Sequence, residues 1–431
     1  MDLMNTYRSR IVTAEEAVRK IKSGDRVFLT GNCSTPQTIL AALVDYAPNL
    51  HNVEITQALT VGPADYVAPE MEGHLRVNTM FVSANIRKAV QEGRADFTPV
   101  LLSEFTLLFK KGYLPLDVAL IHVSPPDNYG FCSFGTEVGL TKTPAESAKM
   151  IIAEVNQQMP RTLGDSFIHI SKIDYIVPVD YPLPEMAMSG EGPSEITETI
   201  AGYIAELIPD GATMQMGIGA IPDAVLKYLY DKKDLGVHTE LFSDGVIDLV
   251  EAGVLTNARK TLHPGKIIAG FILGTQRLYK WVDDNPLIEF HPTEYVNDPF
   301  VIAQNYRQVA INSAIEVDLT GQVCADSIGP KLYSGVGGQL DFIYGASRSN
   351  GGVPIIALPS TAKQYSRIVA MLKPGAGVVT TRNHVRYVVT EYGIADLYGK
   401  TIRQRAKALI KIAHPQFRDE LTRQAKELNY I

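Results

Sequence analysis

Apolar and polar residues follow the same order twice along the chain. In each copy a turn containing glycine precedes a short apolar strand, and a glycine loop and a helix with Pro near its first turn come next. The copies span residues 21–40 and 208–226. This order predicts a strand, a loop and a helix in each copy. Two copies this far apart indicate two related domains rather than a solenoid.

Two further similarities occur in the same order. Residues 127–131 resemble residues 318–322, and each stretch follows an apolar strand and predicts a hairpin turn. Residues 149–154 resemble residues 386–391, and the second copy carries extra residues before this point. Because strands alternate with helices, we expect mostly parallel sheets.

A segment rich in Pro and Gly at residues 180–193 predicts a domain boundary. We therefore expect an N-terminal domain at residues 1–185 and a C-terminal domain at residues 186–431. The expected fold is α/β, with two related open domains, each on a mostly parallel sheet, that face each other across an active-site cleft. Such a cleft is the expected ligand site.

Composition narrows the classes of function. The formal charge of −7 argues against a general nucleic-acid binder, although local cations and N–H groups can still hold an anionic ligand. The three cysteines are far apart and form no CxxC motif, so we expect neither a disulfide framework nor a zinc site, which fits a reducing cytoplasm. The first residues show no signal-peptide pattern, and no apolar run is long enough to predict a membrane span.

Glu240 is a candidate nucleophile. It lies in residues 238–245, between a Gly-x-Gly loop at residues 217–219 and a second glycine-rich turn at residues 335–338. A carboxylate is ionised at neutral pH and needs no neighbouring base, and bare glycine backbone can hold an oxyanion. Most Glu residues are solvated surface charges, however, and Asp244 is a rival carboxylate that we expect to cap a turn or helix.

Three motifs together resemble the class I coenzyme A transferases, in the acetyl-CoA hydrolase/transferase family: residues 215–222, 238–245 and 334–342. The resemblance runs over nearly the whole chain, and two stretches near its end agree with it: residues 389–397 and 413–415. Within the family, two stretches favour the branch that acts on 4-hydroxybutyrate: residues 153–156 and 164–169.

The resemblance implies a ping-pong transfer of coenzyme A from an acyl-CoA to a short-chain carboxylate, such as 4-hydroxybutyrate or butyrate, with acetate or acetyl-CoA as the other partner. Coenzyme A would be both part of the substrate and part of a glutamyl-CoA thioester intermediate, and no metal is implied. The family also implies a homodimer. Cysteine usage, net charge and the lack of a long apolar run are the grounds for expecting a cytoplasmic protein with no nucleic-acid or membrane partner.

The family assigns roles to individual positions. Glu240 matches the nucleophile, Asn297 matches an amide that hydrogen-bonds the nucleophile, and Gly338 matches an oxyanion-hole N–H. The resemblance also implies coenzyme A contacts, at Gly217, Ile218, Gly219, Ala220, Ile221, Ile315, Ser334, Gly338 and Lys363.

Each position also has a purely structural explanation. The Gly-x-Gly loop can be a tight turn without a ligand, and Asn297 precedes an Asp-Pro pair that is typical of turns. Ile315 fits a core strand, and Lys363 fits a solvated surface charge. His238 would project to the same side of a strand as Glu240, where we expect it to pack rather than react.

Three other functions stay open. A CoA thioester hydrolase could use the same Glu240 with water as acceptor. A dinucleotide-binding oxidoreductase is weakly indicated, because Pro222 stands where its glycine motif requires a third glycine. A ligand sensor on the same fold would not need Glu240. The preferred acyl group is not readable from the sequence.

Overall fold

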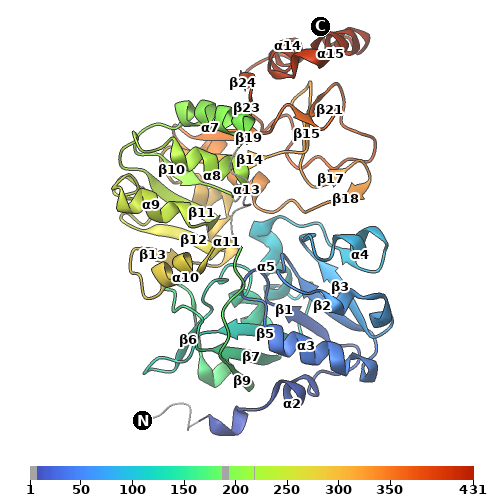
Figure 1. The fold of residues 1–431 in the computed structure, drawn as a ribbon, viewed down its shortest axis with the longest axis vertical. Coiled ribbons are helices and arrows are strands. Elements are labelled where there is room, and N and C mark those ends of the chain that lie inside the picture. Colours follow the sequence, from blue (N-terminus) through green and yellow to red (C-terminus); the bar gives the residue numbers. More distant parts are fainter. Residues whose placement is uncertain (1–6, 187–193, 218) are drawn as a thin grey trace. The chain divides into compact units, whose positions relative to one another are not determined.

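The computed structural model describes residues 7–186, 194–217 and 219–431, and contacts divide the chain into two compact units. Unit 1 contains Met1–Met186 and Ile268–Val296, and unit 2 contains Ala187–Ile267 and Asn297–Ile431. Each unit carries strands with helices packed beside them (Figure 1).

Unit 1 is built on a parallel sheet with the strand order β4-β3-β2-β1-β5-β7-β9. Both faces of such a sheet are covered, so its central strands are apolar, and every residue of β5 is buried. The strands of this sheet are β1 (Arg26–Leu29), β2 (Val53–Gln57), β3 (Leu75–Thr79), β4 (Asp96–Phe97), β5 (Val118–Val123), β7 (Met150–Asn156) and β9 (Tyr175–Val179).

Helices and short strands complete unit 1. Helix α3 follows Pro36 and turns Ile39, Leu40 and Leu43 into the core. The helices are α2 (Ala14–Val18), α3 (Gln37–Tyr46), α4 (Arg87–Gln91), α5 (Leu102–Lys110), α6 (Lys142–Ser147), α10 (Gln276–Val282) and α11 (Thr293–Val296). The short strands are β6 (Phe131–Ser133), which pairs antiparallel with β8 (Phe167–His169), and β12 (Ile267–Ile272) and β13 (Ile288–Phe290).

Within unit 2 the sheet has the order β11-β10-β14-β19-β23-β24. All neighbours are parallel except β23 and β24. The mostly parallel α/β architecture expected from the sequence is therefore confirmed. The strands of this sheet are β10 (Thr213–Gln215), β11 (Gly236–Phe242), β14 (Gln308–Ser313), β19 (Val353–Ala357), β23 (Tyr387–Thr390) and β24 (Gly393–Asp396).

The other elements of unit 2 are helices and short strand pairs. The helices are α7 (Glu195–Leu207), α8 (Ala220–Lys227), α9 (Gly245–Glu251), α12 (Pro299–Ile302), α13 (Gln339–Arg348), α14 (Ile402–Ile412) and α15 (Pro415–Glu427). The short strands are β15 (Glu316–Asp318), β16 (Val323–Cys324), β17 (Ser327–Ile328), β18 (Lys331–Leu332), β20 (Thr361–Ala362), β21 (Tyr365–Ser366) and β22 (Ile368–Val369). In the described part of the chain, no helix is long and apolar enough to cross a membrane.

The turns at Asp127 and Asp318 support the internal repeat. In the first turn, Asp127 Oδ1 accepts the N–H groups two and four residues later, at 2.9 and 3.0 Å. Asp318 Oδ1 does the same, at 2.8 and 3.0 Å. The backbone bonds also match, because each Asp N–H donates to the carbonyl four residues later. The two stretches that look alike in sequence thus form the same turn.

The third sequence similarity does not mark equivalent strands. Strand β7, which holds residues 150–154, lies two places from β1, whereas β23 lies three places from β10. By position in the sheet, β7 corresponds to β19. Strand β23 corresponds to β9, which lies three places from β1, so the similarity of residues 149–154 to residues 386–391 reflects shared apolar strand character.

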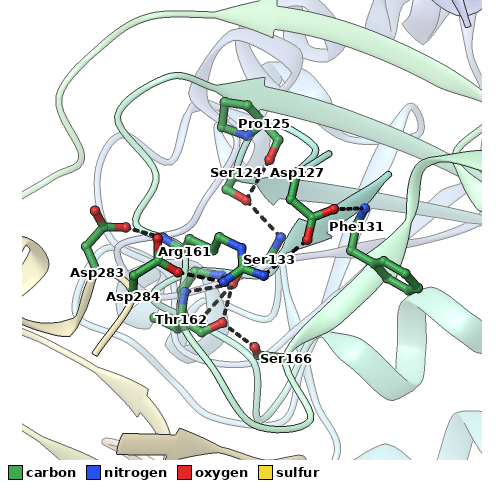
Figure 2. A network of polar contacts seen from close by, with 11 residues as sticks. Ser124, Pro125, Asp127, Phe131, Ser133, Arg161, Thr162, Ser166, Asp283 and Asp284 are labelled. Atoms are coloured by element: carbon green, nitrogen blue, oxygen red, sulfur yellow. Dashed lines mark hydrogen bonds and ion pairs between the residues drawn. The ribbon is translucent and has the colours of Figure 1, made fainter. Parts of the chain in front are cut away.

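Arg161 shows why residues 268–296 belong with unit 1 although they follow the expected boundary (Figure 2). Its Nη1 lies 2.6 Å from Asp284 Oδ1, and its Nη2 lies 3.1 Å from Asp127 Oδ2. Its backbone N–H donates to Asp283 Oδ1 at 2.7 Å. One arginine therefore joins the Asp127 turn to the later segment.

Candidate active site

Glu240 lies on β11, and its side chain is partly buried between residues of unit 2. Burial raises the pKa of Glu240 to about 7, against hydrogen bonds from Asn297 and from the Gly338 backbone, which lower it. Burial therefore disfavours the ionised form of Glu240, an effect that the sequence alone did not indicate. A weakly solvated carboxylate with two fixed donors is suited to nucleophilic attack.

Asn297 holds one oxygen of this carboxylate. Its Nδ2 donates to Glu240 Oε2 at 3.0 Å, and the residue is fully buried. The next residue, Asp298, accepts the N–H of Phe300 at 2.8 Å and caps α12, which begins at Pro299. The Asp-Pro pair thus forms the expected turn, and this turn fixes Asn297 against Glu240.

Gly338 is the residue before α13, and its backbone lies against the same oxygen. A Cβ atom at this position would be 1.8 Å from Glu240 Oε2 and 2.4 Å from Asn297 Nδ2. Its φ of −94° is accessible to any residue, so glycine is required here by space. Gly337 differs, because its φ of 57° favours glycine on conformational grounds.

The Gly-x-Gly loop connects β10 to α8. Gly219 has a φ of 119° and precedes the first helical residue, Ala220, and both are exposed. Gly217 is partly buried and Ile221 is buried, whereas Ile218 lies outside the described residues. The exposed start of a helix can receive an anion, because its first N–H groups have no partner within the helix.

Ile315 and Ser334 lie in two other loops. The alternative explanation of Ile315 as a core strand residue does not hold, because Ile315 is a partly buried bend residue between β14 and β15, and its N–H donates to the Cys324 carbonyl at 2.8 Å. The Ser334 hydroxyl donates to the Ala325 carbonyl at 3.1 Å, which fixes the turn before α13.

Lys363 occupies the turn of a tight hairpin. Strands β20 and β21 pair Ala362 with Tyr365, so Lys363 and Gln364 form a two-residue loop. Lys363 is exposed and has a φ of 54°, which Gly or Asn adopts more readily than Lys. This backbone conformation does not require a lysine. A role of the side chain therefore explains lysine at position 363 better than the turn does.

Two expectations about neighbouring residues can be compared directly with the structure. Asp244 precedes α9 as expected, but its side chain makes no capping hydrogen bond to the helix, so that part of the prediction is wrong. His238 is buried and its ring packs edge-to-face on Phe342, with centroids 6.3 Å apart, which is the packing role expected for it.

Two polar residues near the site escaped the sequence analysis. Asp223, in the first turn of α8, has its pKa raised to about 6 by burial, and it accepts a hydrogen bond from the Ser243 hydroxyl at 3.4 Å. Thr239 precedes Glu240, and its hydroxyl bonds to the backbone of Met216. An acidic residue just after the glycine loop was the available signal for Asp223. Thr239 gave no signal, because a buried Thr is common in any strand.

The strand that carries Glu240 has a counterpart in unit 1. Thr213 pairs with Gly236 in unit 2, and Arg26, its counterpart in the repeat, pairs with Glu54. Four residues further along the chain, Glu240 on β11 corresponds to Ala58, which directly follows the last residue of β2. The first copy therefore has no carboxylate at this position.

Both parts of the chain match models of one family. Residues 1–184 match the acetyl-CoA hydrolase/transferase N-terminal domain, and residues 274–425 match the acetyl-CoA hydrolase/transferase C-terminal domain. The chain belongs to the acetyl-CoA hydrolase/transferase family, as the sequence motifs indicated.

Individual relatives are similar over most or all of their length. The chain is 52% identical to the 4-hydroxybutyrate coenzyme A transferase of Clostridium kluyveri, over 99% of this chain and 100% of the relative. It is 49% identical to a succinyl-CoA:acetate/propanoyl-CoA:succinate CoA transferase of Fasciola hepatica, over 95% of this chain and 86% of the relative. The crystal structure of a 4-hydroxybutyrate CoA-transferase from Porphyromonas gingivalis is similar, with a TM-score of 0.86, 41% identity and 99% of each chain covered.

Proposed function

We propose that this protein transfers coenzyme A from an acyl-CoA to a short-chain carboxylate by a ping-pong mechanism, with Glu240 as the nucleophile. The observation that carries the proposal is the arrangement at one carboxylate oxygen. Asn297 Nδ2 lies 3.0 Å from Glu240 Oε2, and the Gly338 backbone approaches the same oxygen too closely for any side chain.

The first half-reaction forms two covalent intermediates. Glu240 attacks the thioester carbonyl of the acyl-CoA, which forms a mixed anhydride and releases the thiolate of coenzyme A. The thiolate then attacks the glutamyl carbonyl, the bond to the acyl carboxylate breaks, and Glu240 holds coenzyme A as a thioester. An incoming carboxylate reverses both steps, so no water and no net proton are consumed.

The two donors suit the second step in particular. Asn297 Nδ2 already contacts Oε2 of Glu240, which remains as the carbonyl oxygen after acylation, and the Gly338 backbone lies against the same oxygen. When the thiolate attacks, negative charge develops on that oxygen, and fixed donors stabilise it without reorganisation. One well-placed donor of this kind is typically worth about 3 kcal/mol. Asn297 and the Gly338 N–H thus orient the nucleophile first and act as oxyanion donors afterwards.

We propose that the glycine loop, with Gly217, Gly219, Ala220 and Ile221, contacts coenzyme A. The exposed start of α8 is suited to a negatively charged or strongly polar group. We assign further coenzyme A contacts to Ile315, Ser334 and Lys363 from the family resemblance. The hairpin conformation of Lys363 supports that assignment, because the lysine charge is the property that the turn itself does not require.

We propose 4-hydroxybutyrate or butyrate, with acetate or acetyl-CoA, as the substrates. The name of the 52% identical relative supports 4-hydroxybutyrate. The relatives support transfer more strongly than hydrolysis, which would need water to intercept the glutamyl thioester. We also propose that the protein is a cytoplasmic homodimer and needs no metal. The homodimer rests on the family resemblance, the cytoplasmic location on the wide spacing of the cysteines, and the lack of a metal on both.

Trapping the intermediate tests the proposal. The protein is incubated with an acyl-CoA and then treated with borohydride or hydroxylamine, and peptides are analysed by mass spectrometry. We expect modification at Glu240 in the wild type and none in Glu240→Gln. Asp244→Asn, which removes the neighbouring rival carboxylate, should retain the modification at Glu240.

Other outcomes would count against the assignment. Modification at another residue, or unmodified Glu240 during measurable turnover, would contradict it. Loss of acyl-CoA without any carboxylate acceptor, at a rate similar to that with acceptor, would favour the hydrolase. Binding of acyl-CoA with no exchange in either wild type or Glu240→Gln would favour a sensor.

A further inference from the structure

The chain leaves the sheet of unit 2 at Met216, immediately before the glycine loop. Strand β10 ends at Gln215, and its pairing with β11 ends at Met214 and Val237. Backbone groups that leave a sheet while buried need other partners. Met216 is buried, and a single side chain provides hydrogen-bond partners for its backbone N–H and carbonyl.

That side chain is Thr239. Its Oγ1 accepts the Met216 N–H at 3.3 Å and lies 2.9 Å from the Met216 carbonyl oxygen, to which it can donate. The Leu241 carbonyl, at 2.8 Å, is a second possible acceptor for the single hydroxyl proton. Thr239 is fully buried, so water does not compete for these bonds.

Gln215, the residue before Met216, is attached to β14, the strand on the other side of β10. Its Oε1 accepts the backbone N–H of Ile311 at 3.0 Å and Nδ2 of Asn312 at 3.1 Å, both on β14. The two residues before the loop are therefore attached to the strands on either side of β10. Only the Thr239 attachment reaches the strand that carries Glu240.

Thr239 and Glu240 are adjacent on β11 and point to opposite faces of the sheet. The Thr239 hydroxyl therefore holds Met216 at the start of the loop, while the Glu240 carboxylate lies in the candidate active site. The start of the loop, at Met216, is therefore connected to Glu240 through the Thr239 hydroxyl and one residue of backbone.

We infer that Thr239 is a positioning residue that sets the glycine loop at the correct distance from Glu240, so that coenzyme A bound by the loop presents its thioester to the carboxylate. This inference rests on the proposed function. Binding energy from the remote part of a substrate accelerates the reaction only when that part is held in register with the reacting group.

A Thr239→Val variant tests this, because valine has a similar shape without the hydroxyl. We measure kcat/KM for an acyl-CoA and for the same acyl group on N-acetylcysteamine, which lacks the nucleotide and most of the pantetheine. Misplacement of a bound substrate by about 1 Å can cost about 100-fold, so we expect a 10- to 100-fold loss with acyl-CoA. The loss with the short thioester should be much smaller, because this substrate does not reach the loop.

Thr239→Ser is the matched control, because serine keeps the hydroxyl and should restore the preference for acyl-CoA. If Thr239→Val does not fold, Thr239→Cys replaces it in the same comparison, since its longer C–S bond and weak donor also disturb the contact with Met216. Equal losses for both thioesters, or no loss with acyl-CoA, would overturn the inference. A merely structural role would lower the unfolding temperature without changing the ratio between the two substrates.

The labelling experiment separates this inference from the proposed function. If wild-type Glu240 is not modified by acyl-CoA, the proposed function fails whatever Thr239 does. If Glu240 is modified and Thr239→Val keeps the wild-type ratio between the two thioesters, only the positioning role fails.

Discussion

The Gly338 backbone lies directly against the carboxylate of Glu240, and a Cβ atom there would be 1.8 Å from Oε2. No real Cβ contact is that short, and the clashing group is the side chain on which the proposed reaction depends. Even the smallest substitution at position 338 must therefore move Glu240, Asn297 or the start of α13.

Gly338→Ala should abolish most of the transferase activity without unfolding the protein. Displacing the carboxylate from two donors should cost at least about 100-fold in kcat, the typical effect of losing one oxyanion donor. Steady-state kinetics and labelling of Glu240 measure the effect. Gly253→Asn is the matched control, because a Cβ at position 253 meets nothing within 4 Å and Asn tolerates its φ of 72°. Near wild-type turnover of Gly338→Ala would show that the backbone contact is not needed.

Asn297→Ala should change the pH dependence as well as the rate. The Asn297 hydrogen bond lowers the pKa of Glu240, so its removal should raise that pKa and move the acidic limb of the kcat profile to higher pH. We expect roughly a 10- to 100-fold loss at pH 7 and partial recovery at higher pH. Asn297→Asp should shift the limb further, because it places a second carboxylate beside the first. An acidic limb that does not move in either variant would contradict this role.

Glu240 should destabilise the folded protein at alkaline pH. Its pKa is raised from 4.5 to about 7 in the folded state, mainly by burial, so folding favours the protonated form. The corresponding stability is fully present below the unfolded pKa and is lost as the pH rises through about 7. Glu240→Gln, which cannot ionise, should therefore exceed the wild type in free energy of unfolding at pH 8 by up to about 3 kcal/mol.

Thermal unfolding of both proteins across the pH range checks this prediction. The measurement at pH 4 is its own control, because both side chains are then uncharged and the two proteins should have similar stability. If the difference between the two proteins is the same at pH 4 and pH 8, burial does not raise the pKa of Glu240.

Lys363→Asn should weaken the use of acyl-CoA without disturbing the hairpin. Asn adopts the φ of 54° more readily than Lys, so the backbone should be kept while the charge is lost. We expect KM for acyl-CoA to rise roughly tenfold, as for the loss of one charge-assisted hydrogen bond, with kcat little changed. Lys363→Arg, which keeps the charge, should stay closer to the wild type. Equal KM values in Lys363→Asn and the wild type would mean that Lys363 does not contact the substrate.

Much of the candidate catalytic cluster could be predicted from the sequence because it depends on short motifs. Glu240, Asn297 and Gly338 each stand in a recognisable stretch, and the structure brings them together. The reason for glycine at position 338 was not predictable, because it depends on the approach of α13 to β11, and these elements are far apart in the chain.

Hydrogen bonds between side chains and the backbone could not be predicted from the sequence either. The link between Thr239 and Met216 depends on where β10 stops pairing with β11, and periodicity does not define strand ends to one residue. The correspondence of β7 with β19 was missed because any two apolar strands look alike. Residues 268–296 return to unit 1 through ion pairs such as that of Arg161 with Asp284, which leave no local pattern.

The alanine at position 58 has a consequence for how the two copies of the repeat can change over time. Ala58, just after β2, has no group that could react, whereas its counterpart Glu240 on β11 must keep its carboxylate for the proposed reaction. Mutational tolerance at equivalent positions should therefore be unequal. The two copies share a strand, loop and helix scaffold, but the carboxylate proposed as the nucleophile stands in the second copy and not in the first.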